Sequence, residues 1–177
     1  MSILKIGNLK NLKQTHEFVA CQRFLSIYNE TENSYIEIIR LGDPNKKEPD
    51  CICSNDFAIE LVGVYDNSYQ AEKVWSVPRN KDVSKQPNYK LFSLDNLQNE
   101  IGIKLSKLNR GNYGGFSGKI LLACNLHDPL LQDKEVENYV KIHAPFYRDG
   151  HFEKYFYQIW ILWKSERNGD WKIKKLE

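Results

Sequence analysis

Residues 57–64 constrain the fold of this chain more than any other segment, because they read FAIELVGV and are apolar at almost every position. Successive side chains of a β-strand point to opposite faces, so the even-numbered residues of this segment share one face and the odd-numbered residues share the other. Both faces are apolar except at Glu60. We therefore expect a buried strand within a central sheet.

Glu60 is the exception on this strand. A buried carboxylate without a partner costs several kcal/mol, so it requires a cation or a hydrogen-bond donor beside it. Residues 52–59 predict a hairpin with its turn at residues 54–56. The hairpin brings Asp50, which directly follows Pro49, towards Glu60. Two carboxylates brought together in this way can bind a divalent metal ion.

The pair Pro49-Asp50, followed by Glu60 on the next strand, resembles the core motif of the restriction-endonuclease-like nucleases, the PD-(D/E)XK superfamily. The resemblance implies that Asp50 and Glu60 bind Mg²⁺ or Mn²⁺ and that the protein acts on DNA. In this family the lysine of the motif is thought to orient or activate the attacking water. The matching position here is Val62, so the resemblance supports metal binding better than it supports cleavage.

A lysine on a nearby helix offers a substitute. Residues 93–108 predict a helix that opens with Ser93 as an N-cap and has Asp95 in its first turn. Its apolar side chains recur at helical spacing and form the expected buried stripe: Leu94, Leu97, Ile101, Leu105 and Leu108. Lys104 flanks this stripe. Some superfamily members are similar in carrying the lysine on a neighbouring helix, so the resemblance implies this catalytic role for Lys104.

Residues 11–29 predict a second helix near the N-terminus. One side of it carries the apolar side chains of Phe18, Cys21, Phe24, Leu25 and Tyr28. Many superfamily members supply a further acidic ligand from their first helix, and the resemblance implies Glu17 for this role. The alternative is a solvated carboxylate, because most helix glutamates are exposed.

The order of these elements predicts an α/β fold. The resemblance covers roughly residues 17–125 and ends with an apolar strand at residues 119–124. We expect a mixed central β-sheet of five or six strands, flanked by the helices at residues 11–29 and 93–108, in a restriction-endonuclease-like core.

The C-terminal third adds further elements. Residues 133–142 predict a helix, and residues 156–163 form an apolar, aromatic run suited to a buried strand. A tight turn containing Asn168-Gly169 then leads to a last strand at residues 171–176. The length of 177 residues fits one nuclease-like domain spanning residues 1–177.

Basic residues concentrate in the middle of the chain, although the net charge is only +2. At residues 78–120 lysine and arginine outnumber aspartate and glutamate by 8 to 3, whereas the counts are 8 to 11 before this segment and 9 to 9 after it. Cations beside a carboxylate metal site favour a phosphodiester substrate. The side chains expected to contact nucleic acid are Lys81, Lys85, Lys90, Lys107 and Arg110. A merely solvated loop is the alternative.

The four cysteines lie in apolar segments, where a thiol behaves as a small hydrophobe. We expect Cys51 and Cys53 to point to opposite faces of their strand, which is poor geometry for one tetrahedral zinc site. A structural disulfide is not expected in a reducing cytoplasm.

The glycine-rich run at residues 109–118 lacks the spacing of a phosphate-binding loop. Its aromatic residues, Tyr113 and Phe116, either stack on bases or pack over the core. His127, His143 and His151 have no metal-pair spacing, and we expect surface or hydrogen-bonded side chains.

Two functions follow as hypotheses. The first is a Mg²⁺-dependent nuclease that hydrolyses DNA, with Asp50 and Glu60 binding the metal and Lys104 positioning the water or stabilising the phosphate. The second is a nuclease-like module that binds nucleic acid or protein without cutting. We expect a cytoplasmic protein with no membrane partner, since neither a signal peptide nor a run of 18 apolar residues is present. The resemblance also implies a homodimer.

Overall fold

The computed structural model describes residues 12–65, 93–128, 131–147 and 152–176. Its elements follow one another in the order α1 (Leu12–Glu32), β1 (Ile38–Leu41), the 3₁₀ helix η1 (Pro44–Lys46), β2 (Cys51–Cys53), β3 (Phe57–Val64), α3 (Ser93–Asn109), β4 (Lys119–Leu126), α4 (Asp133–His143), the 3₁₀ helix η3 (Ala144–Tyr147), β5 (Gln158–Lys164) and β6 (Trp171–Lys175).

The strands form one mixed sheet of six, in the spatial order β1-β2-β3-β4-β5-β6. Neighbouring strands are antiparallel from β1 to β3 and between β5 and β6, whereas β3, β4 and β5 are parallel. Parallel neighbours need long crossovers, which contain α3 between β3 and β4 and α4 between β4 and β5. The predicted α/β class and the mixed sheet of five or six strands are therefore confirmed.

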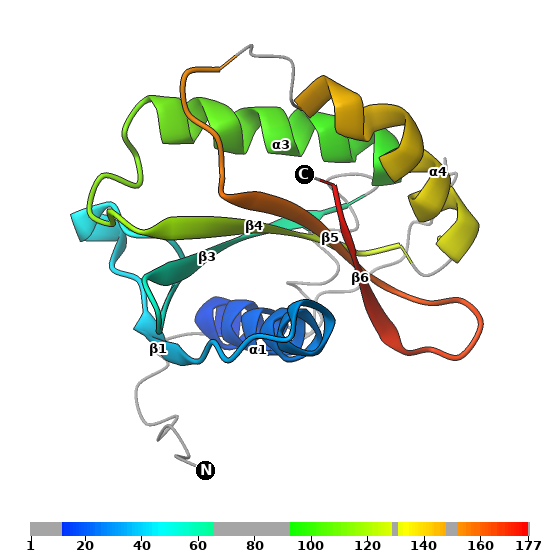
Figure 1. The fold of residues 1–177 in the computed structure, drawn as a ribbon, viewed down its shortest axis with the longest axis horizontal. Helices are drawn as coiled ribbons and strands as arrows, with labels where there is room; N and C mark the ends of the chain where they lie inside the picture. The colour runs from blue at the N-terminus through cyan, green and yellow to red at the C-terminus, as the bar shows by residue number, and fades with distance from the viewer. Residues whose placement is uncertain (1–11, 66–92, 129–130, 148–151, 177) are drawn as a thin grey trace, which may run out of the picture.

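Helices cover both faces of the sheet. Helix α1 lies on one face, and α3 and α4 lie on the other (Figure 1). Each face has its own buried apolar cluster: one beneath α1, including Phe24, Ile59 and Trp160, and one beneath α3 and α4. The expected stripe of α3 is confirmed, because Leu97, Ile101 and Leu105 are buried and the two flanking leucines pack against them. Burial on both sides explains why β3 is apolar on both faces.

The turns form where the sequence has residues that tolerate a positive φ. Between β2 and β3, in the three-residue connection 54–56, Asn55 and Asp56 have φ of 57° and 62°, the left-handed conformation that a tight hairpin turn requires, which confirms the predicted turn. Gly169 has φ of 73° in the predicted turn between β5 and β6. Helix α1 ends before Asn33, whose φ of 48° stops the helical hydrogen-bond pattern.

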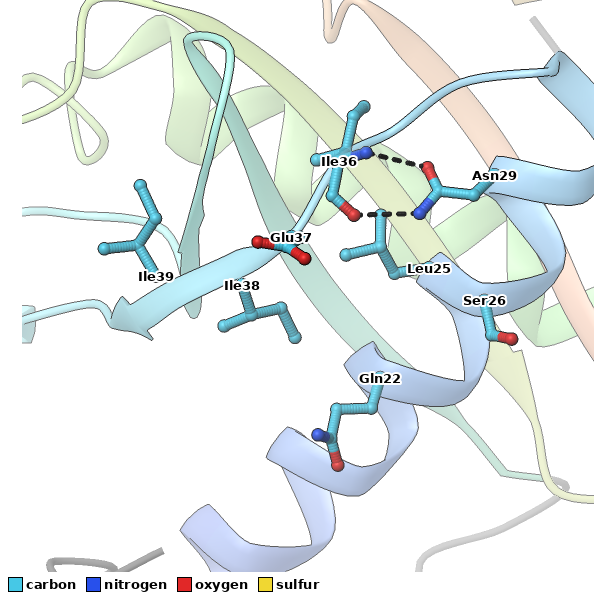
Figure 2. A pocket seen from close by; sticks show the side chains of 8 residues that line it. All are labelled: Gln22, Leu25, Ser26, Asn29, Ile36, Glu37, Ile38 and Ile39. Atoms are coloured by element: carbon cyan, nitrogen blue, oxygen red, sulfur yellow. Dashed lines mark hydrogen bonds between the residues drawn. The ribbon is translucent and has the colours of Figure 1, made fainter. Parts of the chain in front are cut away.

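Strand β1 was not predicted from the sequence. It is a short edge strand of four residues, and a side chain of α1 binds the segment just before it. The Asn29 side chain donates a hydrogen bond to the carbonyl oxygen of Ile36 at 2.8 Å and accepts one from its amide at 3.1 Å, as Figure 2 shows. An edge strand of this kind depends on a partner element rather than on its own periodicity.

The expectation for the cysteine pair was wrong. Cys51 and Cys53 both lie in the buried cluster beneath α1, together with Cys21. Residues two apart on a strand share a face, so their thiols point the same way. All four cysteines are reduced and buried.

None of the helices in the described part of the chain has the length and apolar character needed to cross a bilayer.

Candidate functional site

Asp50 and Glu60 meet where the β2–β3 ladder ends. In this antiparallel pair Cys51 lies opposite Ile59, so the next residues along the register are Asp50 and Glu60. The chain leaves the ladder at this point, and Oδ2 of Asp50 accepts a hydrogen bond of 2.8 Å from the amide of Leu61. The side chain of Asp50 thus takes the place of a backbone carbonyl as the acceptor for this β3 amide, and its carboxylate is held beside Glu60.

Glu60 is buried, with 7% of its side chain exposed, and has two partners on the face of the sheet that α3 covers. Nζ of Lys104, on α3, donates a hydrogen bond to Oε1 of Glu60 and a second one, of 3.2 Å, to the carbonyl oxygen of Leu61. The hydroxyl of Tyr113 donates a hydrogen bond of 2.8 Å to the same Oε1. The cation and the donor that a buried carboxylate requires are therefore both present.

These contacts shift the pKa values of the cluster. Burial, together with the charge of Glu60 and, to a smaller extent, the charge of Glu17, raises the pKa of Asp50 to about 7. The charge of Lys104 and the hydrogen bond from the Leu61 amide act in the opposite direction and lower this pKa. Burial lowers the pKa of Lys104, but the charge and hydrogen bond of Glu60 outweigh burial, so the net shift is upward. Burial raises the pKa of Tyr113 well above its usual value, and Glu60 raises it further. Lys104 stays protonated at neutral pH.

Two carboxylate oxygens remain for a metal ion. Oδ1 of Asp50 and Oε2 of Glu60 accept no hydrogen bond from any described residue. Hard oxygen donors that repel one another fit Mg²⁺ or Mn²⁺, because Mg²⁺ is often bound by one or two carboxylates, with water and phosphate oxygens completing the shell. The residues present therefore fit such an ion.

Glu17 does not join Asp50 and Glu60 as a third ligand. Within the described residues, no three side chains of His, Cys, Asp and Glu are grouped so that they could hold a metal ion. Glu17, on α1, is half-buried, and its charge contributes to the raised pKa of Asp50. The predicted three-carboxylate set is thus reduced to two.

Val62, at the position of the family lysine, lies in the apolar cluster beneath α3 and is 6% exposed. Lys104 reaches Glu60 from the helix that packs over this cluster. Lys104 on α3 therefore supplies the cation beside Glu60, which the apolar side chain of Val62 cannot supply.

A tight loop contact positions the segment that leads to Asp50. The amide of Gly115 donates a hydrogen bond of 3.1 Å to the carbonyl oxygen of Lys47, just after η1. A Cβ on Gly115 would lie 1.9 Å from the carbonyl oxygen of Lys46, so only glycine fits there. The amide of Gly42 also donates to the carbonyl oxygen of Asp50, at 2.9 Å. The glycine-rich loop thus supports the Pro-Asp segment from one side.

Two of the five predicted nucleic-acid-binding residues, Lys107 and Arg110, lie in the described part of the chain. Lys107, on α3, and Arg110, just after it, are exposed and line a hollow together with Phe152, and no residue of the carboxylate cluster lines that hollow. Lys81, Lys85 and Lys90 lie outside the described residues. A second hollow, between α1 and β1 (Figure 2), is also lined by none of the predicted site residues.

Tyr113 is the residue of this cluster that the sequence did not assign. The sequence predicts base stacking or core packing for it, and its ring is in fact buried against Phe156, with a centroid separation of 6.0 Å. It lies 53 residues from Glu60 in the chain, so no spacing pattern connects the two. His127 is hydrogen-bonded as expected, at 3.1 Å from the side chain of Asn125.

No protein-family model, no curated protein and no solved structure matches this chain. Function must therefore be argued from the cluster itself.

Proposed function

We propose that this protein is a metal-dependent nuclease that hydrolyses DNA phosphodiester bonds. One observation carries the proposal: two adjacent carboxylates, Asp50 and Glu60, share their site with the protonated amine of Lys104. Two acids and a lysine are the groups needed to bind a divalent cation and to neutralise a phosphate.

The order and pairing of the elements also support this proposal. Helix α1, the antiparallel strands β2 and β3, helix α3 and the parallel strand β4 follow the succession expected for a restriction-endonuclease-like core. The Pro-Asp pair leads into β2, and Glu60 lies within β3. Lys104 reaches the site from α3, which is the position implied for a lysine that has moved from the strand.

Each residue then has a chemical role. Asp50 and Glu60 would hold the cation through the oxygens that accept no hydrogen bond from the described residues. A bound Mg²⁺ or Mn²⁺ ion would lower the pKa of a water ligand and polarise the phosphate. Lys104 orients the attacking water or stabilises the negative charge that develops on the phosphate oxygens. Tyr113 holds Oε1 of Glu60, so that Oε2 stays available.

A second candidate is a nuclease-like module that binds nucleic acid without cutting it. Val62 at the position of the strand lysine favours this candidate, because that position is packed in the apolar core. The ion pair between Lys104 and Glu60 favours it too, since the lysine already satisfies the carboxylate.

A cleavage assay separates the two candidates. Purified protein is incubated with plasmid and with single-stranded DNA, with Mg²⁺, Mn²⁺ or EDTA. Asp50→Asn and Glu60→Gln should abolish metal-dependent cutting, and Lys104→Met should lower it by about 100-fold or more. Lys141→Met, an exposed lysine of α4, is the matched control and should cut at the wild-type rate.

The outcomes decide between the proposals. Cutting that persists unchanged in both carboxylate variants would indicate a contaminant and reject the nuclease proposal. Mn²⁺ binding measured by calorimetry, with DNA binding but no cutting, would favour the second candidate.

A further inference from the structure

A groove lies next to the carboxylate cluster, between the glycine-rich loop and the segment before β5. Its lining is aromatic, glycine-rich and basic, and includes Tyr113, Phe116, Lys119, Lys154, Tyr155 and Tyr157. The charged residues of this lining are two lysines, and it contains no carboxylate. The groove therefore has the charge expected for a partner that carries phosphates.

An aromatic ring is partly exposed to solvent at this groove. Tyr157 is 48% exposed, although it follows the buried Phe156. Nζ of Lys119 lies 4.7 Å from the centroid of the Tyr157 ring, and the ring of Phe57 supports Tyr157 edge-on at 5.6 Å. Lys119 lies over one face of this half-exposed ring, so a base stacked on the other face would have a phosphate contact within the same site.

The walls of the groove are held in place by hydrogen bonds. At the end of α3, the Asn109 side chain donates to the carbonyl oxygen of Lys154 at 2.9 Å and accepts from its amide at 3.0 Å. The amide of Tyr157 donates to the carbonyl oxygen of Ile120 at 2.9 Å. Because both walls are tied to α3 and β4, the groove does not need to form upon binding.

Tyr113 connects the groove to the carboxylates. It lines the groove, and its hydroxyl binds Oε1 of Glu60. A strand lying in the groove would therefore pass close to the site where a phosphodiester is cut.

We propose that this groove binds single-stranded DNA, with an unpaired base on Tyr157 and backbone phosphates on Lys119 and Lys154. A single strand is favoured over a duplex, because the bases of a duplex are already stacked on one another and cannot cover a protein ring. The inference rests on the proposed function for the identity of the substrate, but the binding itself requires no metal.

The test is a binding measurement in EDTA, where no cutting takes place. The probe is fluorescein-labelled oligothymidylate of about 12 nucleotides, compared by anisotropy with a duplex of the same length. Wild-type protein should bind the single strand more tightly, and Tyr157→Ala should weaken binding about tenfold. Tyr157→Phe keeps the stacking ring and should bind within about twofold of wild type. Lys119→Gln should weaken binding and reduce its dependence on salt.

Tyr35→Ala is the control for loss of an exposed ring, since Tyr35 is 90% exposed and does not line the groove. Melting temperatures check that every variant is folded.

Tighter binding of the duplex, or a Tyr157→Ala variant that binds like wild type, would overturn the inference. If the groove variants lose binding while no form of the protein cuts DNA, the nuclease proposal alone fails. If the protein cuts but the groove variants bind normally, the groove proposal alone fails.

Discussion

Nζ of Lys104 on α3 donates a hydrogen bond to Oε1 of Glu60 on β3, across 44 residues of sequence. This contact joins the helix that covers the sheet to the carboxylate buried within it. Only 14% of the Lys104 side chain is exposed, so the pair is shielded from water. Because two buried charges satisfy one another, the loss of either one has a larger effect than the loss of a surface pair.

The first prediction concerns the stability of this pair. Lys104→Met should lower the free energy of unfolding by about 3 kcal/mol in EDTA at neutral pH, because it leaves Glu60 buried beside Asp50 without a cation. Adding Glu60→Gln to that variant should recover more than half of the loss, since no uncompensated charge remains. Urea denaturation measures both changes. Equal losses in the single and double variants would contradict a charge-based cause.

The second prediction is a pH dependence with a defined sign. The folded-state pKa of Asp50 is about 7, above its ordinary value of 3.8, so between these values the folded state binds more protons than the unfolded state. Stability in EDTA should therefore fall as the pH rises through this window. Asp50→Asn removes the charge and keeps an oxygen for the Leu61 amide.

The stability gained by Asp50→Asn over wild type should accordingly grow between about pH 5 and about pH 8. Chemical denaturation at several pH values gives this difference. Glu137→Gln, which removes an exposed carboxylate of α4, is the control and should show no such trend. A constant difference for Asp50→Asn would show that its charge is not buried as described.

The third prediction concerns the contact between the glycine-rich loop and η1. Gly115→Ala places a methyl group against the backbone carbonyl of Lys46 and should cost about 2 kcal/mol of stability. It should also reduce metal-dependent cutting, because the displaced segment leads to Asp50. Gly102→Ala, in α3, meets no atom within 4 Å and should stabilise the protein by about 0.5 to 1 kcal/mol. Thermal melts of the two variants should therefore shift in opposite directions.

The fourth prediction separates stability from function at Asp133. Its carboxylate accepts hydrogen bonds from Lys172 at 2.7 Å, Trp163 at 2.8 Å and Ser165 at 2.9 Å, which tie the start of α4 to β5 and β6. The hydrogen bond from Lys172 is the main cause that lowers the pKa of Asp133 to about 2, from its ordinary value of 3.8.

The resulting stabilisation is present above the ordinary pKa and is lost as the pH falls towards 2. Asp133→Asn should cost about 2 kcal/mol at neutral pH and less at about pH 3. DNA cutting per folded molecule should stay unchanged, because Asp133 belongs to no proposed site. A specific loss of cutting in this variant would instead link α4 to the reaction.

Local patterns of the sequence determined much of the fold. The stripe of α3 follows from helical spacing, and the burial of β3 follows from an apolar run on both faces. The turn at Asn55 and Asp56 follows from residues that tolerate positive φ. The same reasoning also placed Asp50 near Glu60, because a hairpin joins residues that are close in sequence.

Contacts between distant residues were decided by the tertiary structure alone. The partnership of Tyr113 with Glu60, the exclusion of Glu17 from a three-carboxylate group and the short edge strand β1 each depend on how separate elements pack. Periodicity showed that Lys104 flanks a buried stripe, but only the packing of α3 on β3 set its amine on the carboxylate. A sequence pattern indicates which side of a helix or strand is buried. Which side chains a buried residue contacts depends on how all the elements pack on the sheet.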